Sequence, residues 1–207
     1  RRFRGDDAEV LAAYRSDPAT SELQSWTVPY PRERAERLIA EQDGLAGPTD
    51  GQWFSIGIAD LVTDELIGDV ATNVEWGGNS VEIGYTLAPA ARGHGIVTEA
   101  VGAVVDALIG GGARRVRAET HPDNVASLRV LERLGFDEEG TDVGAYWVGD
   151  PPDEIVSDNV RYGMTAERRK AWLDRPLQPP AEVTLVELTN DSARTYGGLA
   201  THRTQRA

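Results

Sequence analysis

The feature that most constrains this chain is a pair of glycines between a strand-like segment and an apolar helix. Residues 80–87 alternate polar and apolar side chains as a strand does, and residues 97–108 repeat apolar side chains at helical spacing. Between them stands Arg92-Gly93-His94-Gly95. Unpaired N–H groups at a helix N-terminus attract anions, and glycine lets an anion approach the backbone closely. The segment therefore predicts an anion site.

The loop alone does not identify the anion. A Walker A loop needs Gly-Lys-Ser/Thr after a longer glycine run, which is absent, and the dinucleotide fingerprint needs a third glycine where Thr98 stands. An isolated Gly-x-Gly more often forms a tight turn that binds nothing. The loop has to be interpreted together with the segments around it.

The periodicity of the remaining chain predicts a mixed α/β fold. Runs of helical spacing and runs of strict alternation interleave, with the strands concentrated first, which favours a mixed and mostly antiparallel sheet with flanking helices over a doubly wound parallel one. Two closing strands are expected around an insertion at residues 142–153. The predicted helices are 8–15, 31–42, 97–108 and 124–134, and the predicted strands are 53–60, 66–76, 80–87, 115–120, 136–140 and 156–164.

The chain divides into a main domain and a tail. Residues 1–164 carry the continuous pattern of strands and helices, while residues 165–180 read as a charged helix followed by a proline-rich linker. Residues 181–207 begin a new alternation at Val183–Leu188. This extension is either the start of a second domain copy or a strand that completes a sheet.

Composition excludes several classes of chemistry. The chain has no cysteine, so it has neither disulfides nor a sulfur nucleophile, and no histidine or carboxylate group has metal-ligand spacing. The formal net charge of −13 disfavours nucleic acid and favours cationic partners. The apolar stretch Ala100–Ile109 is too short to cross a membrane, and no signal peptide is recognisable. A cytoplasmic protein without a metal cofactor is expected.

A set of motifs resembles one enzyme family. Val81–Pro89, Ala91–Ala100, His121–Ser127 and Leu131–Phe136 are similar, in order and spacing, to the motifs of the GNAT superfamily of N-acetyltransferases. Within it, the closest resemblance is to the branch of ribosomal-protein N-terminal alanine acetyltransferases. The resemblance covers residues 1–164 and implies the GNAT acyl-CoA N-acyltransferase fold, in which the strands at 80–87 and 115–120 splay apart.

The resemblance also implies where acetyl-CoA binds. The pantetheine arm inserts between the splayed strands, and the diphosphate lies on the glycine loop. One departure is Ala90, where many members have Gln or Arg; the nearby Arg92 supplies a cation instead. The implied cofactor-binding residues are Leu87, Ala88, Arg92, Gly93, His94, Gly95, Ile96, Val97, Asn124 and Ser127.

Acetyl transfer to an amine needs a base and a proton for the departing thiolate. Glu82 is the candidate base, acting directly or through water; the alternative is an ordinary half-exposed strand acid. Ser127 is the candidate donor toward the thiolate; the alternative is a helix residue bonded to its own backbone.

His121 is either catalytic or packs the turn before Pro122. Tyr85, Tyr146 and Tyr162 are further candidate proton donors, although the alternation also suits Tyr85 to the core.

The function expected is acetyl transfer from acetyl-CoA to a primary amine, a peptide N-terminus or a small cationic amine, in a ternary complex. Acceptor selection is expected at Trp26–Tyr30, around Trp53, and at residues 144–153 with Tyr146 and Trp147. The alternative is a catalytically silent acyl-CoA-binding sensor or scaffold. If the tail strand completes the sheet of a neighbouring molecule, the protein is a homodimer. The alternatives are that the strand completes the sheet of its own molecule or that the chain is a fragment of a tandem protein.

Overall fold

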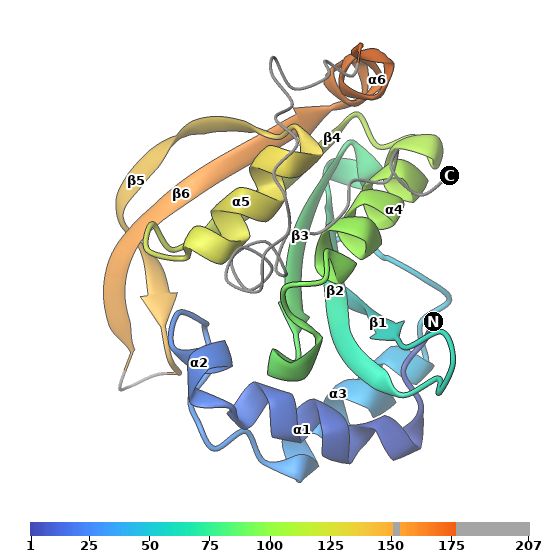
Figure 1. Cartoon of the computed structure of the whole chain (residues 1–207), viewed down its shortest axis with the longest axis vertical. Coiled ribbons are helices and arrows are strands. Elements are labelled where there is room, and N and C mark those ends of the chain that lie inside the picture. The colour runs from blue at the N-terminus through green and yellow to red at the C-terminus, as the bar shows by residue number, and fades with distance from the viewer. Residues whose placement is uncertain (151–153, 177–207) are drawn as a thin grey trace, which may run out of the picture. The chain divides into compact units, whose positions relative to one another are not determined.

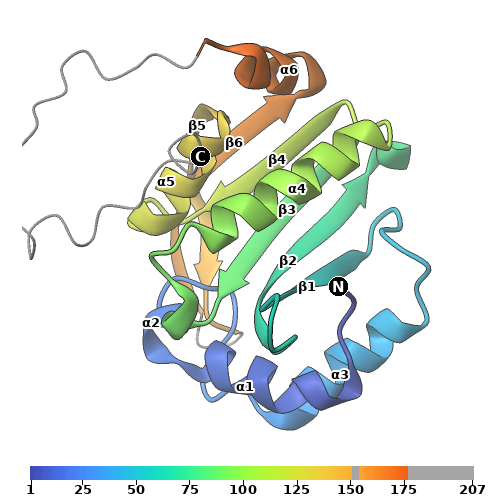
Figure 2. The same ribbon diagram turned by 45° about the vertical axis from the view of Figure 1, so that its right-hand side comes forward.

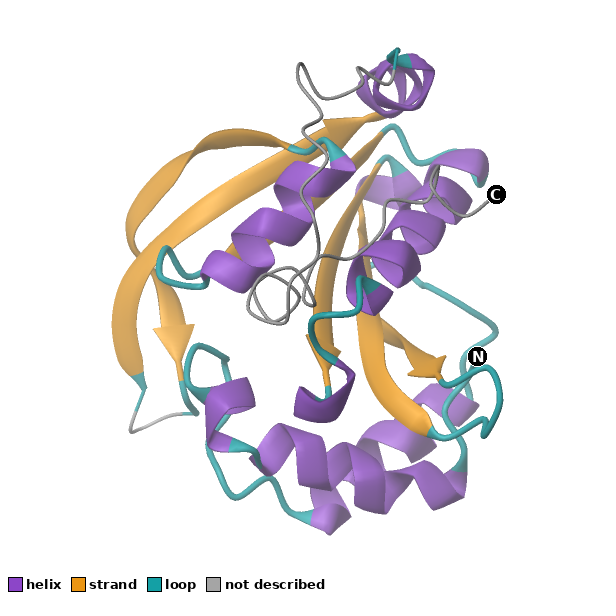
Figure 3. Ribbon diagram, viewed as in Figure 1, coloured by secondary structure: helices purple, strands orange, loops and turns teal. Residues whose placement is uncertain are grey.

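A computed structural model describes residues 1–150 and 154–176 of the chain (Figure 1). Three helices come first along it, three strands follow, and helices and strands are mixed after that (Figure 3). Short 3-10 turns lie at Gly5–Asp7, Trp76–Gly78 and Pro89–Ala91. The helices are α1 (Ala8–Ser16), α2 (Pro18–Ser21), α3 (Arg32–Asp43), α4 (Ile96–Gly110), α5 (Val125–Leu134) and α6 (Ala166–Asp174). The strands are β1 (Trp53–Ala59), β2 (Leu66–Glu75), β3 (Ser80–Leu87), β4 (Arg115–Thr120), β5 (Asp137–Val148) and β6 (Ile155–Thr165).

The six described strands form one sheet in the order β1-β2-β3-β4-β6-β5. Every neighbouring pair is antiparallel except β3 and β4, which are parallel. The parallel pair requires a crossover, and α4 provides it. The predicted mixed, mostly antiparallel sheet is confirmed.

The main core lies between the sheet and the helices α4 and α5, which cover the same face (Figure 2). Val101 and Val105 of α4 and Leu131 of α5 are fully buried there, against strand residues such as Ile83 and Val116. The apolar stripe of each helix therefore faces the sheet, as its spacing predicts.

A second core holds the N-terminal helices together. Leu11 of α1 and Ile39 of α3 are buried in it, with Phe3 and Leu66. The proline predicted for the first turn of α3 stands one position earlier: Pro31 is the N-cap, with extended backbone. This cluster fixes the segment between α1 and α3 that borders the site.

The predicted bounds of β3 and β4 agree with the structure. Helix α5 begins where its cap predicts, since the Asn124 side chain accepts a hydrogen bond from the N–H of Ser127 at 3.1 Å. The helix ends at Gly135, which adopts the left-handed conformation at φ 86°.

The predicted insertion at residues 142–153 is wrong over most of its length. Strand β5 continues to Val148 and pairs with β6, so the two form a long hairpin. The ladder shifts register between Glu138 and Gly140 and again between Asp142 and Tyr146. These bulges break the alternation along the strand, which is why the pattern indicated a loop. The short helix α2 was also not predicted.

Helix α6 was predicted as a charged segment leading to the linker. Its Arg169 is buried and donates to Asp106 of α4 at 2.7 Å and to the carbonyl of Leu134 at 3.1 Å. Residues Arg1–Leu173 accordingly form one compact unit. The predicted strand at Val183–Leu188 lies outside the described residues. No described helix is long and apolar enough to span a bilayer.

Replacing Leu131 by alanine is expected to lower the free energy of unfolding by about 2–5 kcal/mol, because the side chain is fully buried and leaves a cavity. The matched control is Leu61→Ala, at a fully exposed turn, with an expected change within about 0.5 kcal/mol. Urea denaturation measures both. Equal losses for the two variants would show that the core is not where the structure places it.

Candidate active site

The site begins where β3 and β4 part. Their parallel ladder runs from the pair Ser80 and Arg115 to the pair Ile83 and Ala118, and no further. Beyond it β3 stays paired with β2 as far as Leu87, while β4 follows β6. The two strands therefore leave the sheet open between them. A cleft of about 450 Å³ is lined by residues on both sides of this opening.

Alternate residues at the end of β3 direct their backbone groups either to β2 or into the opening, and Ala88 is bonded on the β2 side. The N–H of Ala88 donates to the carbonyl of Ile67 in β2 at 2.8 Å, and its own carbonyl accepts from Ala91 at 3.0 Å. Because antiparallel hydrogen bonds alternate along a strand, Tyr85 and Leu87 direct their backbone groups the other way, toward β4. Leu87 thus has its N–H open for a ligand, whereas the backbone groups of the predicted Ala88 are already engaged.

The glycine loop forms one end of the cleft. Gly93 and Gly95 have φ of 83° and 77°, a left-handed conformation that favours glycine. Gly95 is the N-cap of α4, and no side chain caps this helix. The first backbone bond of the helix runs from the N–H of Glu99 to Gly95, so the N–H groups of Ile96 and Val97 have no partner within the helix. Both residues line the cleft, as the anion prediction requires.

Arg92 and His94 flank these glycines differently. The Arg92 guanidinium donates to the Leu87 carbonyl at 3.2 Å and to the Thr20 hydroxyl of α2 at 2.6 Å, and the residue lines the cleft. His94 is exposed and is not among the cleft-lining residues. Arg92 therefore joins the loop to α2, whereas the predicted His94 does not contribute to the cleft wall.

The start of α5 forms the opposite wall. Asn124 and Ser127 both line the cleft. The Ser127 hydroxyl lies 2.9 Å from the Tyr85 hydroxyl, which also reaches the Ser127 carbonyl at 3.2 Å. Burial raises the pKa of Tyr85 above its usual value, against the opposing effect of its bond to Ser127. Tyr85, which the alternation also suited to the core, thus places its hydroxyl at the cleft with that of Ser127.

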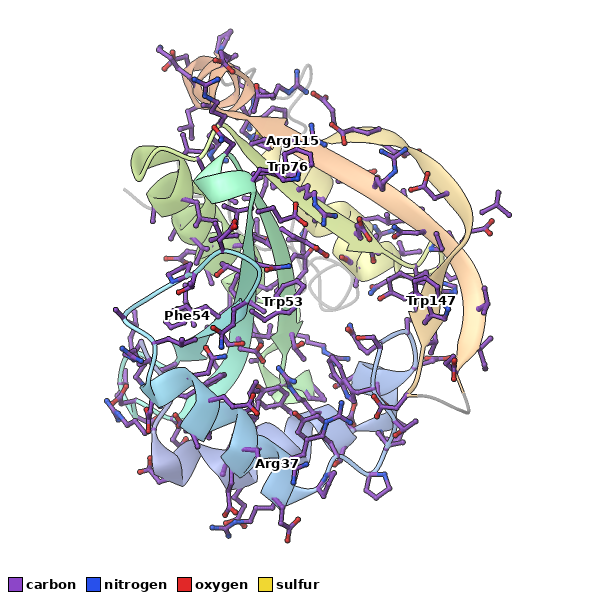
Figure 4. All side chains as sticks on the ribbon, turned by 180° about the vertical axis from the view of Figure 1, so that it is seen from behind. Arg37, Trp53, Phe54, Trp76, Arg115 and Trp147 are labelled. Carbon is purple, nitrogen blue, oxygen red and sulfur yellow. The ribbon has the colours of Figure 1, made fainter. Side chains whose placement is uncertain are left out.

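Charged residues gather on the sheet face turned away from α4 and α5. Trp53, Asn73, Glu82 and Arg117 stand opposite one another across β1, β2, β3 and β4, so their side chains share this face. Figure 4 views the molecule from behind relative to Figure 1, with Trp53 on one edge strand and Trp147 on the other. The row crosses the sheet beside the opening.

Arg117 holds the carboxylates of this face together. Its guanidinium contacts Glu75 and Glu82 at 2.7 Å each and also donates to Glu119. Glu119 accepts a further bond from the Asn159 amide at 2.8 Å. Sequence reasoning missed Arg117 and Glu119, although the alternation of residues 115–120 places both on the same face of β4.

Glu82 is the most perturbed carboxyl of the group. Burial raises its pKa to about 7; Arg117 opposes the rise, and the nearby Glu119 and Glu75 add to it. By contrast, the bond from Arg117 lowers the pKa of Glu75. Glu82 is not among the residues that line the cleft, whereas Glu119 is. Glu82 therefore has a pKa near neutral and lies beside the opening without lining the cleft.

His121 is locked by its neighbours. Its Nδ1 accepts the N–H of Asp123 at 3.0 Å, and its Nε2 lies 2.7 Å from the Ser157 hydroxyl. The Tyr146 ring packs edge-on against the imidazole at 5.9 Å. The Tyr146 hydroxyl donates to the Leu23 carbonyl at 3.0 Å. Both ring nitrogens are thus used within the fold, and Tyr146, which lines the cleft, is fixed in place.

Two of the three predicted acceptor segments, Trp26–Tyr30 and the end of β5, meet at one end of the hairpin, while Trp53 lies on the other edge of the sheet. Asp150 accepts hydrogen bonds from the backbone and hydroxyl of Thr27 and from Arg34, whose guanidinium lowers the pKa of Asp150 to about 2. The Arg15 side chain stacks on the rings of Trp26 and Tyr30. This end of β5 is therefore tied to the segment between α1 and α3. Trp147 is exposed there, and Tyr162 instead lies buried with its hydroxyl near Glu138.

The sequence matches a known family over the part of the chain that builds this site. Residues 1–137 match the Acetyltransferase (GNAT) domain family. The chain belongs to the GNAT acetyltransferase family. The uncharacterized N-acetyltransferase p20 of Bacillus licheniformis is 30% identical over 142 residues, which is 68% of this chain and 79% of that protein. The probable N-acetyltransferase YjcK of Bacillus subtilis is 40% identical over 90 residues, 42% of this chain and 50% of that protein.

Solved structures agree with this GNAT assignment. Mycobacterium smegmatis RimJ, in complex with CoA-disulfide, superposes with a TM-score of 0.69 at 25% identity and covers 81% of each chain. The ribosomal-protein-S5-alanine acetyltransferase of Vibrio fischeri superposes at 0.66 and 19% identity over 81% of this chain and 92% of that one. The self-immunity acetyltransferase MccE, in complex with acetyl-CoA and AMP, superposes at 0.67 and 20% over 79% and 89%. The chain is a GNAT acetyltransferase that depends on acetyl-CoA.

Among the described residues of this GNAT enzyme, no group of three or more His, Asp or Glu side chains is arranged to hold a metal ion. The polar groups around the opening are instead backbone N–H groups, hydroxyls and carboxylates. The arrangement can bind an anion at the glycine loop and exchange protons near the point where the strands part.

Gly95→Ala is expected to weaken CoA binding about tenfold, because alanine at a left-handed position costs about 1–2 kcal/mol and the loop would leave its anion-binding geometry. Titration calorimetry with CoA measures the affinity. The control is Gly44→Ala, where φ is −75° and an added Cβ meets nothing within 4 Å. Unchanged affinity in Gly95→Ala would separate the loop from the cofactor.

Proposed function

We propose that this GNAT acetyltransferase transfers the acetyl group to a primary amine that approaches the carboxylate face. The observation that carries the proposal is the sharing of one guanidinium, that of Arg117, by the carboxyls of Glu75, Glu82 and Glu119. With all three ionised, the group has an excess of negative charge beside the opening. A cationic acceptor is attracted to such a face, and an anionic one is repelled.

Unsatisfied oxygens beside these carboxylates support an N–H-bearing acceptor. The amide oxygens of Asn73 and Asn159 are buried and have no hydrogen-bond partner among the described residues. Asn73 stands opposite Glu82, and the Asn159 amide already bonds Glu119. A buried acceptor without a donor is costly, and an ammonium group supplies up to three donors.

Space for the acceptor is left over the neighbouring row of the sheet. This row consists of the small residues Ser55, Ala71 and Gly84, which stand opposite one another across β1, β2 and β3. A Cβ built on Gly84 meets nothing within 4 Å, and Gly84 lines the cleft. The amine would therefore reach the thioester over Gly84, at the first position where β3 has left β4.

The cofactor would lie on the other side of the opening. The N–H groups of Ile96 and Val97 would bind the diphosphate, and the open backbone groups of Tyr85 and Leu87 would bind the amides of the pantetheine arm. This path brings the sulfur near the hydroxyls of Tyr85 and Ser127. Cofactor and amine thus meet from opposite faces of the sheet, which is the geometry of direct transfer in a ternary complex.

Glu82 would act as the base through a water molecule, since it stands behind the cleft wall. The ammonium loses a proton toward Glu82, the amine nitrogen attacks the thioester carbon, and the C–S bond breaks as the tetrahedral intermediate collapses. The thiolate then takes a proton from the Tyr85 and Ser127 hydroxyl pair. The second proton that the nitrogen loses as the amide forms restores that pair through water, and Glu82 releases its own proton to solvent. A base with a pKa near the working pH is the most effective one.

The acceptor class follows from the charge of the face and from the relatives. Two solved neighbours are named for ribosomal-protein acetylation: the ribosomal-protein-S5-alanine acetyltransferase of Vibrio fischeri and a protein of Vibrio cholerae proposed to be a ribosomal-protein-serine acetyltransferase. A peptide with a free N-terminal amine is accordingly the first acceptor to test, with small polyamines next.

Release of free CoA thiol from acetyl-CoA measures turnover. The predicted KM for a cationic acceptor rises with ionic strength, because salt screens the attraction. Tight binding of acetyl-CoA without turnover of any amine would instead identify a silent acyl-CoA-binding module.

Glu82→Gln is expected to lower kcat at least a hundredfold, in the range usual for loss of a general base. The control is Glu75→Gln, which also removes a carboxylate bonded to Arg117 but retains Glu82, and is expected to keep most of the activity.

The pH profile distinguishes a base from a structural carboxyl. Because the pKa of Glu82 is raised to about 7, and the ionised form is the base, the rate is expected to rise with pH through about 7 and to fall below it. Glu82→Gln should lose this limb. A variant that retains the wild-type rate or the same limb near 7 would remove Glu82 from the reaction.

A further inference from the structure

Arg129 and Arg133 belong to the minority of described arginines that pair with no carboxylate, a group that also holds Arg2, Arg37, Arg92 and Arg114. The chain has 34 Asp and Glu against 21 Lys and Arg, so carboxylates are plentiful. Arginines such as Arg115, Arg117 and Arg169 hold a carboxylate at close range. Arg129 and Arg133 have no carboxylate partner within residues 1–150 and 154–176. No carboxylate of the described residues neutralises these two guanidiniums.

Both residues line the cofactor cleft. Ala126, Arg129, Val130 and Arg133 all contribute to its wall, and their spacing places them on one face of α5. Arg129 and Arg133 are one helical turn apart, so their guanidiniums project from neighbouring positions on that face. Like charges at this spacing destabilise a helix slightly when nothing neutralises them. The pair is thus better suited to a bound anion than to an empty helix surface.

The anionic group expected at the glycine loop is separate from the one that Arg129 and Arg133 could bind. That loop lies at the N-terminus of α4 and offers backbone N–H groups, whereas Arg129 and Arg133 lie on α5 and offer two guanidiniums. Arg133 is about 9 Å along the helix axis from Ser127, which stands at the thiol end of the cleft. Of the carboxylates that share the cleft wall, Glu119 is occupied by Arg117 and Asn159, and Glu22 lies on the segment after α2. A second anionic group of the cofactor fits the arginine pair.

We propose that Arg129 and Arg133 bind the 3′-phosphate of coenzyme A. CoA carries a diphosphate and, separately, a phosphomonoester on its ribose, which bears close to two negative charges at neutral pH. A guanidinium binds a phosphate oxygen pair in a bidentate manner, and such charge-assisted bonds are stronger than neutral ones. The proposal rests on the acetyl-CoA dependence of the family and is independent of which acceptor the enzyme uses.

The test compares CoA with 3′-dephospho-CoA by titration calorimetry on the full chain. Arg129→Ala and Arg133→Ala are each expected to weaken CoA binding about tenfold, the effect of one charge-assisted hydrogen bond. Binding of 3′-dephospho-CoA should change less than about threefold, since the remaining diphosphate is separated from the arginines and screened by salt. The wild-type protein should itself prefer CoA over 3′-dephospho-CoA, and the double variant should lose that preference.

The matched control is Arg37→Ala, which removes an exposed arginine of α3 (labelled in Figure 4) that is not among the cleft-lining residues. Its affinity for CoA should equal that of the wild type. At saturating acetyl-CoA the kcat of Arg37→Ala should also be unchanged, which shows that loss of an exposed helical arginine leaves the fold and the chemistry intact. Two outcomes overturn the proposal. Equal losses for CoA and 3′-dephospho-CoA would assign the arginines to the diphosphate or to the fold, and unchanged binding of CoA would make them a solvated helix face.

Discussion

The parting of β3 and β4 is the constraint on which the rest of the site depends. The two strands share a parallel ladder only as far as Ile83 and Ala118, because β4 then follows β6 while β3 continues with β2. A parallel pair that separates leaves backbone donors and acceptors unpaired, and buried backbone groups need partners. The opening between the strands is thus a slot that an amide-bearing chain can fill, and the pantetheine arm of acetyl-CoA is such a chain.

The two faces of the sheet beside the slot carry opposite charges. On the side of α4 and α5 stand hydrogen-bond donors and cations: the helix N-terminus at Gly95 and the guanidiniums of Arg92, Arg129 and Arg133. On the opposite face stand acceptors, the carboxylates grouped around Arg117. An acidic chain with a net charge of −13 thereby keeps one wall positive and the other negative, as the proposed sites for a polyanionic cofactor and a cationic amine require.

Local sequence patterns predicted the elements that form the proposed cofactor site. The alternation at residues 80–87 and 115–120, the glycines of the loop and the Asn124 cap are signals within a single segment, and the structure has β3, β4 and α5 where these signals place them. The long β5–β6 hairpin was missed because its bulges break the alternation that identifies a strand. The bonds from Arg117 to Glu75 and Glu82 could not be predicted either, since they depend on the register between three strands.

Amide hydrogen exchange followed by NMR, with and without CoA, tests most directly whether the cofactor fills the slot between β3 and β4. The account predicts that CoA slows exchange at Leu87 and at Ile96 and Val97 of the loop, where N–H groups lack an internal partner. The amide of Glu82, which the ladder alternation directs to β2, should be unaffected. Binding of CoA that leaves Leu87 unchanged while protecting amides elsewhere would contradict the account.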